Sequence, residues 1–232
     1  ILPGLPVKPQ EWFGGDPSRR EVTFPLSSGQ GVADLYLPID EGQHSAILLF
    51  LGVNPAGRDD SRVVSLAEGL ARAGSVVMIP WSDTMAQRRV PVEEVDNLVW
   101  AFQYLVALDE VDADRAGMGG FCVGASLATV AAQDPRIRDV VQFVNFFGGY
   151  YNARDLVLST VSSSRFGDGI EEPWKPDRLT LEVVRAHLIE GVRYESERAL
   201  LNRVFVLRDA VLDPATVDAL SPASRAVFEM LS

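Results

Sequence analysis

The pentapeptide Gly120-Phe121-Cys122-Val123-Gly124 places the only cysteine of the 232-residue chain between two glycines. Residues 115–119 before it are typical of a short buried strand, and residues 125–132 after it are typical of a helix. A sharp strand-to-helix turn needs these glycines, because a Cβ there would collide with the neighbouring strand or helix. Such a turn, a nucleophile elbow, holds its central side chain strained and exposed. The pattern favours Cys122 as a nucleophile over the alternative of a small, buried, inert residue.

Alternating strand and helix patterns surround this turn. Apolar alternation or continuous apolar runs predict six strands, at residues 21–25, 32–37, 46–51, 75–80, 115–119 and 139–147. Apolar stripes of helical period predict helices at residues 61–73 and 92–108. This rhythm indicates an α/β fold, with a mostly parallel sheet flanked by helices.

Three regions follow from the pattern. Residues 1–20, rich in proline and glycine, predict an extended N-terminal arm, and residues 21–151 contain the α/β core. Residues 152–232 predict a helical cap or insertion after the sixth strand, with 203–207 ambiguous between strand and helix. Helical patterns in this last region cover residues 179–189, 195–207 and 214–231. Because the final helix has no clear stop signal, we expect the remaining core strands to lie beyond Ser232.

The composition limits the kinds of partner and metal site that the chain can have. A formal net charge of -11 argues against nucleic acid or an anionic membrane surface as the main partner. One cysteine and two histidines, His44 and His187, argue against a disulfide, a cysteine-based zinc site or a multi-histidine metal site, so we expect no metal. The chain starts at Ile1, and its first residues suggest the hypothesis of a removed signal peptide or membrane anchor. Localisation is therefore open between cytoplasmic, exported and membrane-anchored.

The elbow and the earlier strand ending in Leu51-Gly52-Val53-Asn54 together resemble the α/β-hydrolase superfamily, in particular the dienelactone hydrolases, over residues 21–151. The resemblance implies hydrolysis of a small-molecule ester or lactone without a cofactor. It also implies that Cys122 is the nucleophile and that the backbone N–H groups of Val53 and Val123 form the oxyanion hole. At a helix N-terminus, the sulfur would be favoured as thiolate.

The acid and base of a triad are harder to place. Dienelactone hydrolases have a glutamate near the earlier strand, where this chain has Leu49. Asp155 and His187 are the candidate acid and base, although a helix-dipole partner and a half-buried helix residue are simpler interpretations. Another interpretation puts both groups beyond Ser232. Two further alternatives are a non-catalytic binding protein that keeps the fold without a complete triad, and a nucleotide-binding α/β protein.

Overall fold

The structure is a computed structural model that describes residues 15–167 and 169–232. Contacts divide the chain into two compact units. Among the described residues, we call 15–87 and 91–150 the core unit, and 88–90, 151–167 and 169–232 the C-terminal unit. Most of the expected N-terminal arm lies outside the described residues. Its expected end is corrected, because the first strand already begins at Ser18.

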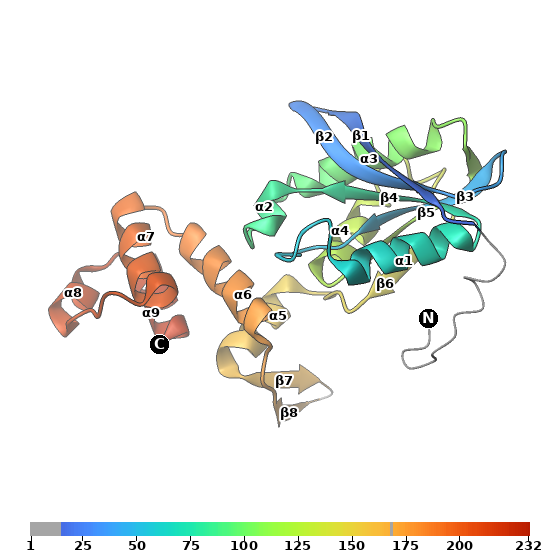
Figure 1. The fold of residues 1–232 in the computed structure, drawn as a ribbon. Coiled ribbons are helices and arrows are strands. Elements are labelled where there is room, and N and C mark those ends of the chain that lie inside the picture. Colours follow the sequence, from blue (N-terminus) through green and yellow to red (C-terminus); the bar gives the residue numbers. More distant parts are fainter. Residues whose placement is uncertain (1–14, 168) are drawn as a thin grey trace. The chain divides into compact units, whose positions relative to one another are not determined.

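Within the described residues, the core unit is built on a six-stranded mixed sheet of order β1-β2-β4-β3-β5-β6 (Figure 1). The strands are β1 (Ser18–Leu26), β2 (Gly29–Leu37), β3 (His44–Phe50), β4 (Ser75–Trp81), β5 (Val111–Phe121) and β6 (Val144–Phe147). The β1-β2 and β2-β4 pairs are antiparallel, and the β4-β3, β3-β5 and β5-β6 pairs are parallel. The parallel strands therefore place their carboxyl ends at one edge, where α/β folds bind ligands.

Helices cover both faces of this sheet. They are α1 (Ser61–Arg72), α2 (Asp83–Ala86), α3 (Glu94–Val106) and α4 (Val123–Ala131). Helix α1 lies on one face, and α3 and α4 lie on the other (Figure 1). Successive strand side chains point to opposite faces, so Ile47 and Leu49 pack in the cluster under α1 while Leu48 is buried on the other face. Burial on both faces explains the continuous apolar run in β3.

The C-terminal unit is mostly helical. Its elements are α5 (Ala153–Ser162), β7 (Ser164–Gly167), β8 (Ile170–Pro173), α6 (Arg178–Glu190), α7 (Glu195–Asn202), the π-helix η2 (Arg203–Leu207), α8 (Pro214–Ala219) and α9 (Pro222–Leu231). Its apolar core consists of Ile189, Val192, Leu201 and Val227. No described helix combines the length and the apolar character needed to cross a membrane.

Several element boundaries differ from expectation. The strand expected at 139–147 is shorter, because residues 134–141 form hydrogen-bonded turns and β6 starts only at Val144. The antiparallel β7-β8 hairpin was not expected at all, since its side chains are largely exposed and lack the alternation of a half-buried strand. Residues 203–207 are helical rather than extended, which resolves the ambiguous pattern.

Candidate active site

Cys122 occupies the turn between β5 and α4, in a backbone conformation that residues other than glycine rarely adopt. Its φ is 53° and its ψ is -137°. Such a conformation costs on the order of 1–3 kcal/mol and persists only where the surroundings enforce it. Here the Cys122 N–H donates to the Phe147 carbonyl on β6 at 2.9 Å, and the Cys122 carbonyl accepts from the Ala125 N–H at 3.0 Å. The thiol itself is exposed.

Three glycines make this turn sterically feasible. A Cβ on Gly120 would lie 2.5 Å from the carbonyl carbon of Gly124. A Cβ on Gly124 would lie 2.4 Å from the Phe50 carbonyl oxygen and 2.5 Å from the Gly52 nitrogen. Gly52 itself has a φ of +70°, and its Cβ would lie 2.8 Å from the Gly124 nitrogen. The loop after β3 therefore packs directly against the first turn of α4.

Two backbone amides lie at this junction. Val123 is the first residue of α4, where N–H groups have no intrahelical acceptor. Val53 follows Gly52 in the loop and is buried. In the part of the chain that the structure describes, neither N–H donates to a protein acceptor. Both amides are thus free to donate to a ligand oxygen.

Tyr150 is a residue of this site that the sequence did not single out among the aromatic residues after β6. Ser126 on α4 holds it, because the Ser126 hydroxyl donates to the Tyr150 carbonyl at 2.8 Å and accepts from the Tyr150 N–H at 3.0 Å. Burial raises the pKa of the Tyr150 hydroxyl, and the negative charge of Cys122 raises it further. The phenol therefore lies within the electrostatic reach of the thiol and stays protonated at neutral pH. Its position just after the carboxyl end of β6 was the available signal.

A small cavity opens beside the Gly52 loop, at the carboxyl ends of β3 and β4. Its volume is about 110 Å³. Its lining includes Gly52, Asn54, Arg58, Trp81, Ser82 and Asp83. The cavity shares Gly52 with the elbow junction.

Comparisons with known proteins agree with this architecture, although no family model matches the chain. A Bradyrhizobium sp. protein named "Probable 2-oxo-3-(5-oxofuran-2-ylidene)propanoate lactonase" is 25% identical over 178 residues, which cover 66% of this chain and 70% of that protein. The crystal structure of hypothetical protein PA2218 from Pseudomonas aeruginosa has a TM-score of 0.51 and 23% identity, over 78% of this chain and 55% of that one. The chain has the α/β-hydrolase fold.

A dienelactone hydrolase structure from Anabaena variabilis is also similar, with a TM-score of 0.47 and 21% identity over 58% of this chain and 65% of that one. The chain thus spans 55% and 65% of the lengths of these two solved structures. The structure confirms the expected fold class, an α/β fold with a mostly parallel sheet flanked by helices.

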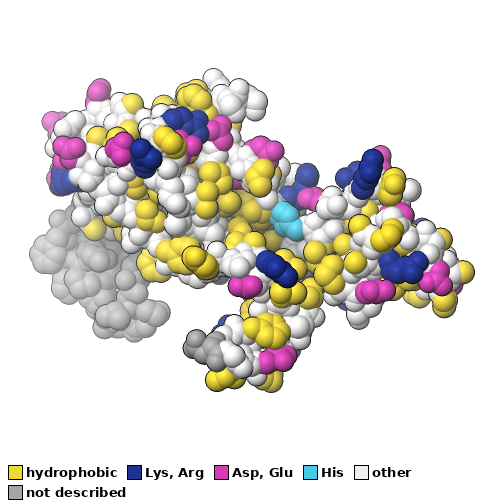
Figure 2. Space-filling view, turned by 180° about the vertical axis from the view of Figure 1, so that it is seen from behind, with side chains coloured by type: hydrophobic (Ala, Val, Ile, Leu, Met, Phe, Trp, Pro, Cys, Tyr) yellow, Lys and Arg dark blue, Asp and Glu magenta, His cyan; other side chains and the backbone are white. Residues whose placement is uncertain are grey.

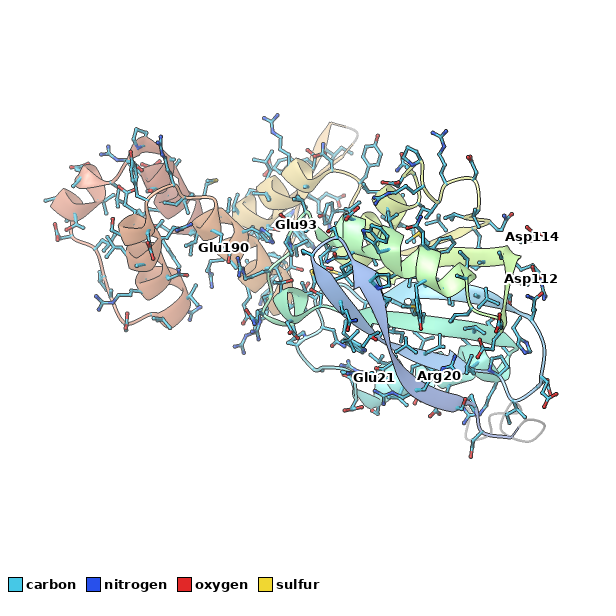
Figure 3. The ribbon with its side chains drawn as sticks, turned by 90° about the horizontal axis from the view of Figure 1, so that it is seen from above. Arg20, Glu21, Glu93, Asp112, Asp114 and Glu190 are labelled. Carbon is cyan, nitrogen blue, oxygen red and sulfur yellow. The ribbon has the colours of Figure 1, made fainter. Side chains whose placement is uncertain are left out.

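The two candidate triad partners belong to the C-terminal unit, whereas Cys122 belongs to the core unit. His187 is half-buried on α6, and its Nε2 accepts the Val90 N–H at 2.9 Å. Burial lowers the pKa of His187 and Arg89 adds to this effect, while Glu190, three residues later on α6 (Figure 3), opposes it. The neutral imidazole therefore uses its Nε2 to hold the backbone at Val90. Asp155 is exposed in the first turn of α5, where it faces the helix dipole.

His44, the other histidine of the chain, lies away from the elbow. His44 begins β3, and its ring hydrogen-bonds the Asp40 carbonyl at 2.9 Å. Because β3 and β5 run parallel, His44 is at the opposite end of the sheet from Cys122. It is therefore not a candidate base.

Part of the negative charge lies far from the elbow. Asp112 and Asp114 lie at the start of β5, the end of that strand remote from Cys122 (Figure 3). Acidic and basic side chains are interspersed with hydrophobic ones over the face seen in Figure 2. No group of three or more histidine, cysteine or acidic residues among the described residues could hold a metal ion.

Proposed function

We propose that this chain is an ester or lactone hydrolase whose nucleophile is Cys122. The observation that carries the proposal is the conformation of Cys122, with a φ of 53° and a ψ of -137° between a buried strand and a helix. An inert cysteine is usually buried and needs no special backbone, whereas this one is exposed on a strained turn. Strain of this kind is maintained at functional sites because it presents the side chain to a ligand. The α/β-hydrolase fold places nucleophiles at this turn.

The chemistry follows from the two amides and the helix end. The Cys122 thiolate adds to the carbonyl carbon, and the oxyanion accepts hydrogen bonds from the Val53 and Val123 N–H groups. Collapse breaks the bond to the ester or ring oxygen, which leaves with a proton, and a thioester remains on Cys122. Water then attacks the thioester and releases the acid, regenerating the thiol. The N-terminus of α4 favours negative charge on both the sulfur and the oxyanion.

Proton transfer needs further groups. His187 and Asp155 remain the base and acid candidates in this proposal, and His187 must exchange the Val90 N–H for a substrate proton to act. Tyr150, whose raised pKa keeps it protonated, is suited to donate a hydrogen bond to an oxygen rather than to remove a proton. We also propose that residues 152–232 form a cap for this site.

The lactonase name of the Bradyrhizobium protein supports a small lactone or ester as the substrate class. The cavity of about 110 Å³ beside Gly52 has room for a small substituent of such a substrate.

Hydrolysis of a short activated ester and of an activated lactone tests the proposal. We expect turnover by the wild type and its loss in Cys122→Ala, because alanine keeps the Cβ but removes the nucleophile. Cys122→Ser is the matched control for geometry, and we expect it to fold equally well with much reduced turnover. Equal rates in wild type and Cys122→Ala would remove the nucleophile assignment. A wild type without turnover that is stabilised by ligand indicates the non-catalytic binding protein instead.

A further inference from the structure

Asp34 is a buried carboxylate at the centre of a hydrogen-bond network in the core unit. It lies on β2 with only 2% of its surface exposed. Arg58 donates to both of its oxygens, at 2.6 Å from Nη2 and 3.2 Å from Nε, and Trp81 Nε1 donates at 2.7 Å. Arg19 Nη2 also donates to the Asp34 carboxylate, at 3.0 Å. Burying two charges costs free energy that their attraction often only offsets, so a buried ion pair adds little net stability. A functional role would explain why this network is present.

The network reaches the elbow junction through one short loop. Arg58 lies five residues after Val53, in the loop between β3 and α1. A compact turn joins them, because the Gly57 N–H donates to the Asn54 carbonyl at 3.3 Å and the Asn54 side chain donates to the Gly57 carbonyl at 3.2 Å. At its other end the loop is fixed by the packing of Gly52 against Gly124. The Val53 amide therefore lies between two fixed points.

We propose that Asp34 is a positioning residue, which holds Arg58 and thereby keeps the Val53 amide beside the elbow. The inference rests on the proposed function, in which Val53 is an oxyanion donor. Trp81, bound to the same carboxylate, lines the cavity next to this loop together with Arg58. Burial by itself raises the pKa of Asp34, but hydrogen bonds from Arg58, Arg19 and Trp81 outweigh it and hold the pKa below its ordinary value. Asp34 is therefore charged at neutral pH.

The same guanidinium offers a matched control. Glu21 on β1 (Figure 3) accepts from Arg58 Nη1 at 2.6 Å, but 59% of its side chain is exposed. An exposed ion pair contributes little to holding a loop. If burial at Asp34 is what fixes the loop, Glu21→Gln should leave it in place whereas Asp34→Asn should release it.

The experiment compares wild type, Asp34→Asn, Arg58→Ala and Glu21→Gln. For each, kcat and KM are measured with a short activated ester, the alkylation rate of Cys122 with iodoacetamide, and amide hydrogen exchange in residues 52–58. We expect kcat to fall about 10- to 100-fold in Asp34→Asn and Arg58→Ala, since a misplaced donor loses part of its transition-state effect. KM and the alkylation rate should stay near wild type, and exchange in residues 52–58 should accelerate. Glu21→Gln should resemble wild type in every measurement.

Arg58→Ala keeps the test valid if Asp34→Asn folds poorly, because Asp34 then retains Arg19 and Trp81. Wild-type kcat in both variants, an equal loss in Glu21→Gln, or a rise in KM alone would each overturn the positioning role. Two other results would count against the proposed function itself: no turnover by the wild type, or turnover that survives in Cys122→Ala. In that case the exchange data decide: faster exchange in Asp34→Asn than in Glu21→Gln supports the role of Asp34, and equal exchange overturns it.

Discussion

Replacing Cys122 by glycine should stabilise the fold while removing the nucleophile. The strained conformation costs on the order of 1–3 kcal/mol for a residue with a Cβ, and glycine adopts it freely. Glycine in turn loses about 0.5–1 kcal/mol through the greater freedom of the unfolded chain. Because the Cys122 side chain is exposed, little packing is lost with it. Cys122→Ala keeps the Cβ and hence the strain, so the difference between the two variants isolates the backbone effect.

At the midpoints of the two ranges, subtracting the entropy cost from the strain leaves Cys122→Gly more stable than Cys122→Ala by about 1 kcal/mol, with an upper limit of about 2.5 kcal/mol. For a chain of this size that corresponds to a rise in Tm of about 2–4 °C, with an upper limit of about 10 °C. Urea and thermal unfolding of both variants measure the difference. Ala132→Gly is the control, since Ala132 has an ordinary φ of -61° and should lose stability on the same change. A Cys122→Gly variant no more stable than Cys122→Ala would refute the claim that the elbow is strained.

Further predictions concern the glycine packing and the titration of His187. Gly124→Ala should destabilise the core unit by about 1–3 kcal/mol and abolish turnover, because its Cβ meets backbone atoms at 2.4 and 2.5 Å. Gly167→Ala, which meets nothing within 4 Å, should leave the urea midpoint unchanged, and equal midpoints for both would contradict the packing argument. Because burial holds the pKa of His187 below 6.5, the unfolded chain takes up this proton first as pH falls. Stability of the C-terminal unit should therefore decline as pH falls from about 6.5 to the lower folded-state pKa. His187→Gln should reduce this decline in urea titrations, and an identical pH dependence in both proteins would rule out His187 as its source.

The elbow could be predicted from sequence because its requirements are local. Gly120 and Gly124 are needed by the turn itself, and the flanking strand and helix are visible in short apolar patterns. Asp34 could not be predicted in the same way. On a strand that alternates it looks like a solvent-facing residue, but in the fold it is buried and bound by Arg58 and Trp81, which come from distant segments. Such a network is a product of the tertiary fold.

In the C-terminal unit, the hairpin was missed and residues 203–207 were left ambiguous, for related reasons. The side chains of the β7-β8 hairpin are mostly exposed, so its sequence does not alternate between apolar and polar residues as a half-buried strand does. Residues 203–207, with two valines and a phenylalanine, have the composition of a strand, but α7 continues directly into them as a π-helix. In the core unit, the sequence could not distinguish Tyr150 from the neighbouring aromatic residues, because only its contacts with Ser126 do so.

Acylation of Cys122 by an ester is direct evidence that its thiol is the nucleophile. Wild type and Cys122→Ala are mixed briefly with a short activated ester, quenched in acid, and examined by intact and peptide mass spectrometry. We expect one acyl group per wild-type chain, located on the peptide that contains Cys122, and none in the alanine variant. Turnover by wild type without an acyl group on Cys122, or equal labelling of Cys122→Ala, would contradict it.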